Sequence, residues 1–399
     1  MNNKILSYLF KNKNLILIVS AYSISFLTIL LYLAFDIIQG GGGYKQGDWL
    51  INNELVEIRR GFFGSLILYI SNLLNFNPLY ILSIIQITIL FLIYITFICV
   101  GIQLKNNDVV FFLLFSPFFI LFWFNDPAGS MRKEIIAYLA FIPFLIAALR
   151  ENKNITNYIL LSVFIYLIAV FSHEANIFFF PFFVAAIYII RKKIDKFFII
   201  FSLVYALISV LGFLYAIRYP MVEDYMLVCQ PLLDQGLSSS VCNGAITWLS
   251  LDSNYALSKT KKLFFSKASL NFLISYIFCL LFFVYILKEY FSIKNILMFC
   301  LVSSFCFSPL WIVALDWGRW INFYVVSLTF LLLIYFLYNK DNFEYTVFNK
   351  SKFIFLLIFC SLFSMPHWVS SDSESIHIFH GYIYTLIKMS YMFFVKIII

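Results

Sequence analysis

The chain has 399 residues, of which 63% are hydrophobic, 21% are aromatic and only 12% are charged. A soluble domain carries about 25% charged residues, so this composition excludes a soluble enzyme, a disordered scaffold and a nucleic-acid-binding domain. The net charge of +8 does not indicate a polyanionic partner, because the Lys and Arg of membrane proteins gather in cytoplasmic loops. We expect an all-α, polytopic integral membrane protein.

The N-terminal segment is the first expected span. Lys4, Lys11 and Lys13 precede an apolar run from Leu15 to about Phe35. The run is longer than the core of a signal peptide and is not followed by a small-residue cleavage pattern. We therefore expect an uncleaved first helix with its basic flank in the cytoplasm.

Basic connectors orient the later spans. The segments 150–153 and 191–196 are rich in Lys and Arg and are separated by two apolar runs, which places both connectors in the cytoplasm. Runs of about 20 apolar residues are long enough to cross a bilayer. Counting from these connectors predicts about twelve spans with both termini in the cytoplasm. The expected spans are 15–35, 79–103, 109–124, 134–149, 157–172, 175–190, 197–217, 268–287, 295–315, 318–338, 353–370 and 382–398.

Two segments are expected to be loops on the outer face. The apolar run 61–74 is short, and counting it as a span would invert every later assignment, so 44–76 is interpreted as an outer loop with an interfacial helix. The polar segment 218–266 is the second outer loop, too short to be a separate domain. Residues 1–399 are therefore expected to form one transmembrane domain.

Two of the seven cysteines lie in the second outer loop. Cys229 and Cys242 would face an oxidising compartment, where such a pair can form a disulfide. The alternative is two unpaired loop thiols. The other cysteines lie in expected spans, where a reduced thiol packs as a small apolar group.

Four short charged clusters are all predicted on the outer face. Ionisable groups at a membrane boundary are costly unless they face water, each other or a ligand. Individually, each cluster is compatible with interface anchoring, and Asp316 with Arg319 fits a simple i,i+3 pair. Together they favour an outer-face functional site. The clusters are Asp48 with Glu54, Glu57, Arg59 and Arg60; Asp126 with Arg132, Lys133 and Glu134; His173 with Glu174; and Asp316 with Arg319.

This set of side chains suits a lipid substrate that carries phosphate. Arg binds phosphate oxygens through two parallel hydrogen bonds and keeps its charge when it is partly desolvated. A nearby carboxylate can accept the proton of an attacking sugar hydroxyl. Fixed Arg side chains would also stabilise a diphosphate leaving group.

The twelve-span layout and the outer-face acidic and arginine motifs resemble GT-C glycosyltransferases, which span the membrane many times and use polyprenyl-linked sugars. In these enzymes the first outer loop carries amphipathic helices and an acidic residue, which is similar to the segment 48–74 here. The size of the chain and its lack of a large soluble domain look like a Wzy-type O-antigen or capsular polysaccharide polymerase. The resemblance covers the whole chain at the level of topology. The loop 218–266 departs from it, because some polymerases have two larger outer loops.

The resemblance implies that the chain polymerises undecaprenyl-diphosphate-linked repeat units at the periplasmic face of the bacterial inner membrane. The implied partners are the lipid-linked glycans, the bilayer and a chain-length regulator, and the scheme requires neither cofactor nor metal. Glu174 would be the general base, and His173 would orient it or contact the diphosphate, with Asp126 and Asp316 as alternative bases. Arg59, Arg60, Arg132, Lys133 and Arg319 would bind diphosphate, and Asp48, Glu54, Glu57 and Glu134 would have supporting roles.

Two other functions fit the same sequence. One is a glycosyltransferase that adds a single sugar from a polyprenyl monophosphate donor. The other, which the sequence favours less, is a flippase of lipid-linked oligosaccharides. Transporters bind their substrates near the middle of the bilayer, whereas the expected spans here are nearly free of central charge apart from Lys388.

The last outer loop contains His367, His377 and His380 near Asp372 and Glu374. Only His377 and His380 have a spacing that shares one helix face, and a third metal ligand is not evident. A solvated loop is therefore preferred to a zinc site.

Overall fold

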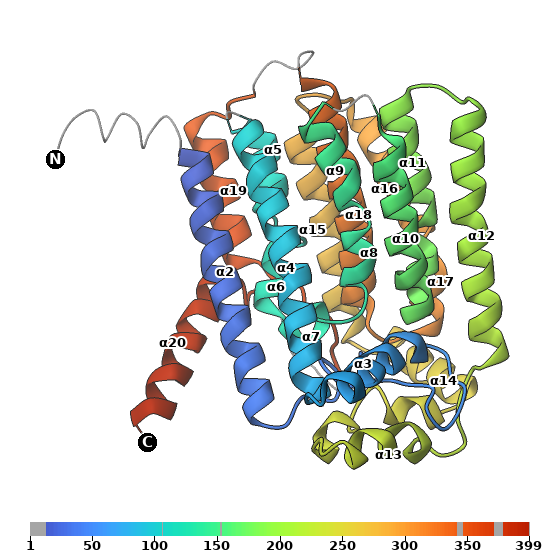
Figure 1. The fold of residues 1–399 in the computed structure, drawn as a ribbon. Coiled ribbons are helices and arrows are strands. Elements are labelled where there is room, and N and C mark those ends of the chain that lie inside the picture. Colours follow the sequence, from blue (N-terminus) through green and yellow to red (C-terminus); the bar gives the residue numbers. More distant parts are fainter. Residues whose placement is uncertain (1–12, 106, 152–153, 341–345, 371–377, 399) are drawn as a thin grey trace. The chain divides into compact units, whose positions relative to one another are not determined.

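The structure is a computed structural model that describes residues 13–105, 107–151, 154–340, 346–370 and 378–398. Every regular element in these ranges is a helix (Figure 1). The chain divides into two compact units. Unit 1 takes its described residues from Met1–Leu27, Phe97–Pro127 and Ser258–Ile399, and unit 2 consists of Thr28–Thr96 and Ala128–Leu257.

Among the described residues, six helical segments are long and apolar enough to cross a membrane. Each coincides with one of the expected spans, which agrees with the prediction of an all-helical polytopic membrane protein. One of them begins as the 3₁₀ segment η1 and continues as α11. The six are α2 (Lys13–Ile38), α4 (Pro78–Gln103), η1 (Glu174–Phe179) with α11 (Phe180–Arg191), α12 (Lys196–Arg218), α15 (Ser269–Leu287) and α18 (Trp317–Tyr338).

The helices in the other six expected spans either have fewer than 18 residues or are interrupted. The span expected at 109–124 is broken at Pro117, because proline disfavours helix at the residue before it and lacks an N–H group. The span expected at 353–370 is wrong at its end, since its helix stops at Leu362, ahead of Pro366. The number twelve stays a prediction. The helices in these segments are α5 (Asp108–Leu114), α6 (Ile120–Asn125), α8 (Ile135–Leu139), α9 (Ile142–Leu149), α10 (Thr156–Ser172), α16 (Ile293–Phe305), α17 (Ser308–Val313), α19 (Lys350–Leu362) and α20 (Tyr382–Ile398).

Helices α10, α11 and α12 lie side by side in unit 2 (Figure 1). The hydroxyl groups of Tyr166 on α10 and Ser209 on α12 are 2.7 Å apart, and Tyr205 on α12 donates to Ser162 on α10 over the same distance. Hydrogen bonds between side chains of neighbouring helices are typical of packing in membranes, where the hydrophobic effect does not drive helices together.

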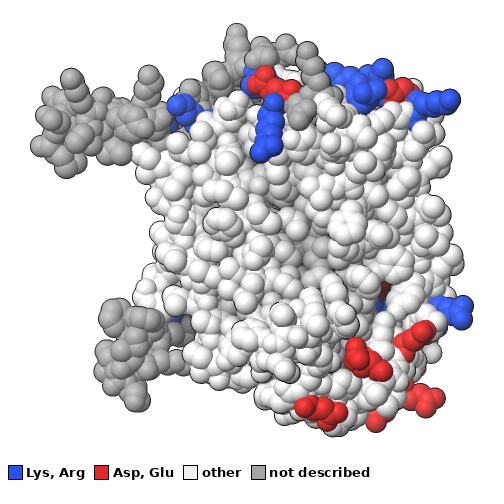
Figure 2. Space-filling view, viewed as in Figure 1, with Lys and Arg blue, Asp and Glu red and all other residues white. Residues whose placement is uncertain are grey.

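The outer surfaces of α10 and α12 are apolar. A soluble protein rarely exposes a contiguous apolar surface of this kind. In the view of Figure 2, the charged side chains lie near the helix ends and the surface between them is uncharged. A bilayer would cover this surface. The exposed side chains include Leu160, Leu161, Phe164, Leu203, Leu207 and Leu214.

The expected interfacial segment is the 14-residue helix α3 (Gly61–Leu74), which lies across the end of α10 in unit 2 (Figure 1). Cys229 and Cys242 form a disulfide with their Cα atoms 5.8 Å apart. The backbone beside it closely approaches the loop before α3, because a Cβ atom on Gly43 would lie only 1.6 Å from the carbonyl oxygen of Asn243. The remaining helices are α7 (Pro127–Ser130), α13 (Met226–Asp234), η2 (Ser239–Val241), η3 (Thr247–Ser250) and α14 (Ser253–Phe264).

In unit 1, α18 is buried along nearly its whole length and forms the core. Helices α5, α15, α16 and α17 pack against it, and α20 packs against α6 and α19. The arrangement brings the start of α18, the end of α6 and the segment after α19 close together, since Gly318 donates its N–H to the carbonyl oxygen of His367 over 3.2 Å.

Candidate functional site

Three of the predicted charged clusters contribute to one group of side chains in unit 2. They come from the loop before α3, the turn before α8 and the junction between α10 and η1. We call this group the Arg60 cluster. It consists of Asp48, Arg59, Arg60, Lys133, Glu134, His173 and Glu174.

Arg60 and Glu174 form the centre of the cluster. The Nε atom of Arg60 donates to Glu174 Oε2 over 2.7 Å, and its Nη2 atom donates to Oε1 of the same carboxylate. Arg59 adds a second guanidinium, with Nη1 3.7 Å from Glu174 Oε1. The side chains of Arg59, Arg60 and Glu174 are 30%, 21% and 22% exposed, so these three groups are the part of the cluster that solvent reaches.

The backbone of Arg60 is held in an uncommon conformation. Its φ of 70° lies in the left-handed region, at the residue that precedes α3. Non-glycine residues seldom adopt this conformation unless the surroundings impose it. The buried Lys133 ammonium supplies such a contact, because it donates to the carbonyl oxygen of Arg60 over 2.7 Å. Burial lowers the pKa of Lys133 to about 8, so the side chain is still mostly protonated at pH 7.

Asp48 lies on the buried side of the cluster and is completely inaccessible to solvent. Its Oδ1 atom is 3.8 Å from Arg60 Nη1, and neither carboxylate oxygen has a hydrogen-bond partner among the described residues. Burial alone would raise the pKa of Asp48, but the charges of Lys133 and Arg60 outweigh it and lower the pKa to about 2. Asp48 is therefore a fixed negative charge on the buried side of the Arg60 guanidinium.

His173 lies between the buried carboxylate of Glu134 and the carboxylate of Glu174 at the centre of the cluster. Its Nδ1 atom accepts the backbone N–H of Ala175 over 3.1 Å, which leaves the proton of the neutral ring on Nε2. Nε2 lies 3.5 Å from Glu134 Oε1, and Nδ1 lies 3.9 Å from Glu174 Oε2. Burial and the charge of Arg60 lower the pKa of His173 to about 4, so the imidazole is neutral at pH 7.

The other residues expected at this site lie at its edge. Glu54 and Glu57 are exposed, and Glu57 lies beside Tyr219. The guanidinium of Arg132 lies over the ring of Tyr44 at 4.7 Å, and its Nε atom donates to the carbonyl oxygen of Ala128. Within the described residues, the carboxylates that pair with Arg59 and Arg60 are those of Glu174 and Asp48.

Asp126, Asp316 and Arg319 belong to unit 1. Asp316 and Arg319 form the i,i+3 ion pair that the sequence suggested as the structural alternative, with 2.6 Å between Arg319 Nη1 and Asp316 Oδ2. The Arg319 guanidinium also lies over the ring of Trp320 at 4.7 Å. Asp126 pairs instead with His367, whose Nδ1 atom is 2.5 Å from Asp126 Oδ2.

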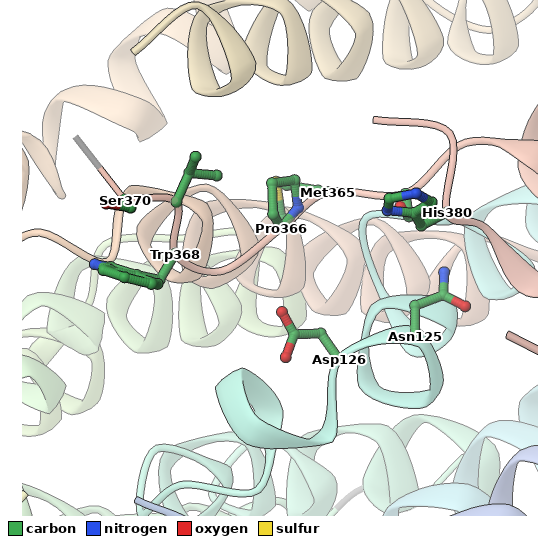
Figure 3. Close-up of a pocket in the computed structure, with 9 residues that line it drawn as sticks. Asn125, Asp126, Met365, Pro366, Trp368, Ser370 and His380 are labelled. Atoms are coloured by element: carbon green, nitrogen blue, oxygen red, sulfur yellow. The ribbon is translucent and has the colours of Figure 1, made fainter. Parts of the chain in front are cut away.

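A pocket in unit 1 opens beside Asp126 (Figure 3). Its volume is about 400 Å³, within the range of about 300–1,000 Å³ that small-molecule sites usually have. His380, one of the three histidines of the last expected outer loop, lines this pocket. His377, Asp372 and Glu374 lie outside the described residues.

Within the part of the chain that the structure describes, no group of three His, Cys, Asp or Glu residues is arranged to hold a metal ion. A scan against protein-family models gave no match to this chain, and searches of curated proteins and of solved structures gave none either.

The Arg60 cluster can bind an anion and can supply a carboxylate next to it. Two partly exposed guanidinium groups share one carboxylate, and an anionic oxygen could replace that carboxylate as their partner. The sequence indicated the charged groups but not their pairing, because Arg60 and Glu174 are 114 positions apart. The partnership of Asp126 with His367 was likewise not predicted, because these residues are 241 positions apart.

Proposed function

We propose that this chain is a membrane glycosyltransferase that polymerises undecaprenyl-diphosphate-linked repeat units. The observation that carries the proposal is the partly exposed arrangement of Arg59, Arg60 and Glu174 above the buried Asp48. It offers paired guanidinium groups for a diphosphate and one accessible carboxylate for a sugar hydroxyl. Long apolar helices in the same chain would give access to substrates that remain in a bilayer.

The donor diphosphate would bind to Arg59 and Arg60. Both guanidinium groups are within 4 Å of Glu174, so phosphate oxygens would compete with this carboxylate for the same N–H donors. Arg is suited to this exchange because it remains charged and presents its donors as a rigid fork. Asp48 would keep Arg60 in place from the buried side during the exchange.

Glu174 would act as the general base once the diphosphate has replaced it as the hydrogen-bond partner of the two arginines. A carboxylate whose lone pairs are occupied by guanidinium N–H groups is poorly able to accept a proton. Binding of the donor would release Glu174 and so couple the presence of substrate to the activity of the base. Among the acidic side chains of the cluster, Glu174 is suited to this role because Asp48 and Glu134 are buried.

The reaction would then proceed as a displacement at the anomeric carbon of the donor. The hydroxyl oxygen of the acceptor forms a bond to this carbon, and its proton passes to Glu174. The bond between the anomeric carbon and the phosphate oxygen breaks, and its electron pair stays with undecaprenyl diphosphate. The charges of Arg59 and Arg60 stabilise this leaving group as its negative charge grows.

The first test is deletion of the gene followed by complementation, with surface glycolipids separated on a gel. The proposal predicts loss of the long ladder and lipid capped by one repeat unit. A persistent ladder with changed sugar composition would instead indicate a transferase that adds single sugars. Loss of the single capped unit as well would indicate a flippase or an earlier assembly enzyme, and an unchanged ladder would refute all three.

Substitutions in the cluster test the assigned roles in the complemented strain. Arg60→Ala removes a charge-assisted phosphate contact worth about 1.5–3 kcal/mol, so we expect a loss of about 10- to 150-fold in rate. Glu174→Gln removes the base, for which we expect a loss of about 10²- to 10⁴-fold. Arg191→Ala is the matched control, because Arg191 also pairs with a carboxylate in unit 2, that of Asp195, but lies in a predicted cytoplasmic connector.

Protein abundance in the membrane separates a chemical role from a structural one. The proposal expects Glu174→Gln to accumulate like the wild type while the ladder disappears. Full activity of either cluster variant would show that its assigned role is wrong. A parallel fall of abundance and activity in both variants would mean that the Arg60 cluster stabilises the fold and does not act on substrate.

A further inference from the structure

The pocket in unit 1 differs in chemistry from the Arg60 cluster. It lies between the end of α6, which supplies Asn125 and Asp126, and the segment 364–370 after α19. Figure 3 shows Asp126 below this segment, with Trp368 and Ser370 at one end and Asn125 and His380 at the other. All of these residues belong to unit 1.

The segment 364–370 is fixed by backbone contacts. Gly318 at the start of α18 lies so close to it that an added Cβ atom would be 1.8 Å from the carbonyl oxygen of Pro366. At its start, Ser364 donates its N–H to the carbonyl oxygen of Ile378 over 2.9 Å. This part of the pocket wall is therefore preformed, which reduces the conformational entropy that the protein loses when a ligand binds.

Asp126 is held in one orientation at the floor of the pocket. Its Oδ2 atom accepts the backbone N–H of His367 over 3.0 Å and lies 2.5 Å from the Nδ1 atom of the same residue. A carboxylate anchored through one oxygen cannot rotate freely, so the direction of its hydrogen bonds is set before a ligand arrives.

Asn125 adds a polar group that has no partner on its donor side. Its side-chain oxygen accepts from the Thr385 hydroxyl over 3.2 Å, whereas its Nδ2 atom is buried and has no hydrogen-bond partner among the described residues. Buried donors are nearly always satisfied in folded proteins. Because Asn125 is part of the pocket wall, a rotation of its side chain would offer this unsatisfied donor to a hydroxyl group of a ligand.

The pocket lining matches a neutral polyhydroxyl ligand. A carboxylate, an amide, an imidazole and two serine hydroxyls provide both donors and acceptors, while the indole of Trp368 remains 49% exposed beside them. No Lys or Arg contributes to the lining within the described residues, so a phosphate would meet a carboxylate there but no guanidinium or ammonium group. A sugar ring presents hydroxyl groups at its edge and apolar C–H groups on its face, which an indole can cover.

We propose that this pocket is a carbohydrate-binding site that takes a neutral sugar ring of the glycan. Trp368 would cover the apolar face of the ring, and Asp126 and Asn125 would bind its hydroxyl groups. The inference that the sugar belongs to the transferred glycan rests on the proposed function. The lining of this pocket suits a sugar, whereas the Arg60 cluster suits a phosphate.

The test uses the full-length protein in detergent and the neutral oligosaccharides released by mild acid from the surface glycolipids of the host. Saturation-transfer NMR gives the dissociation constant of these oligosaccharides. Trp368→Ala is expected to weaken binding by about tenfold or more, and Asp126→Asn to weaken it as well. Trp368→Phe should keep most of the affinity, because a flat ring remains.

Trp248→Ala is the matched control, since Trp248 is also a partly exposed indole, at 37%, but belongs to unit 2. The affinity of the Trp248→Ala variant for the oligosaccharides should equal that of the wild type. Equal loss in the Trp248 and Trp368 variants, unchanged binding in Trp368→Ala, or no saturable binding by the wild type would each overturn the pocket assignment. Gel filtration of each variant shows whether a loss of binding reflects a loss of fold.

The outcomes separate this inference from the proposed function. If complementation restores the ladder but the wild type binds no oligosaccharide, the pocket assignment fails and the glycosyltransferase proposal stands. If the deletion leaves the ladder unchanged while Trp368→Ala loses oligosaccharide binding, the pocket assignment stands and the proposed reaction fails.

Discussion

Replacement of Asp48 by Asn tests the electrostatic account of the Arg60 cluster. Asp48 is completely buried, and no described hydrogen bond satisfies its oxygens, so its contribution to stability comes from its charge. Asn has nearly the same shape but no charge. The substitution would leave Lys133 and Arg60 without the buried negative group that faces them.

The size of the effect follows from the pKa of Asp48, which drops from the ordinary 3.8 to about 2. Each pKa unit corresponds to about 1.4 kcal/mol, so the ionised carboxylate stabilises the fold by about 2–3 kcal/mol at pH 7. Because the pKa is lower in the folded state, this stabilisation is complete above the ordinary pKa. It is lost as the pH falls through 3.8 towards 2.

Unfolding of the full-length protein in mixed micelles with increasing SDS measures this difference. Asp48→Asn should unfold at a lower SDS fraction than the wild type at pH 7, and the gap should narrow below about pH 4. Glu54→Gln is the control, because Glu54 is an exposed carboxylate of the same loop and its loss should change stability by no more than about 0.5 kcal/mol. The reasoning is refuted if Asp48→Asn matches the wild type at pH 7, or if the gap is the same at pH 3.

Three further predictions concern other parts of the fold. Replacing Cys229 and Cys242 together by Ser should cost about 3 kcal/mol, because the disulfide closes a loop with a sequence separation of 13; thiol alkylation before and after reduction checks the pairing. Gly318→Ala should lower the melting temperature through an overpacking cost of about 1–3 kcal/mol against Pro366. The pKa of His173 is lowered to about 4 in the folded state, so the unfolded state takes up a proton first as the pH falls. The free energy of unfolding of the wild type should therefore decrease by about 2 kcal/mol from pH 7 to pH 5. His173→Gln should lack this loss in melts recorded at both pH values.

The controls for these predictions come from the same chain. Gly101→Ala places its Cβ 3.3 Å from the nearest atom, the Cδ1 of Ile18, and should be nearly neutral. If Gly318→Ala melts like Gly101→Ala, the close approach to Pro366 is not as tight as described. Rapid alkylation of Cys229 in the unreduced protein would contradict the disulfide, and an equal pH response of His173→Gln and the wild type would contradict the neutral buried imidazole.

Local features of the sequence determined the class of the protein and the positions of its main helices. Runs of about 20 apolar residues predict helices wherever they occur, and six described helices coincide with such runs. The interruptions were less predictable, because hydropathy averaged over a window does not register a single proline. Pro117 breaks one expected span and Pro366 follows the early end of another, although both segments remain apolar.

The charged residues of the candidate sites were also evident in the sequence, since few such residues occur in so apolar a chain. What the tertiary structure decided is which of them meet. Arg60 pairs with Glu174 because the loop before α3 lies at the end of α10, and Asp126 pairs with His367 across 241 positions. Such contacts depend on which helix ends lie side by side. Hydropathy and spacing are local properties, and they carry no information about the neighbours that packing selects.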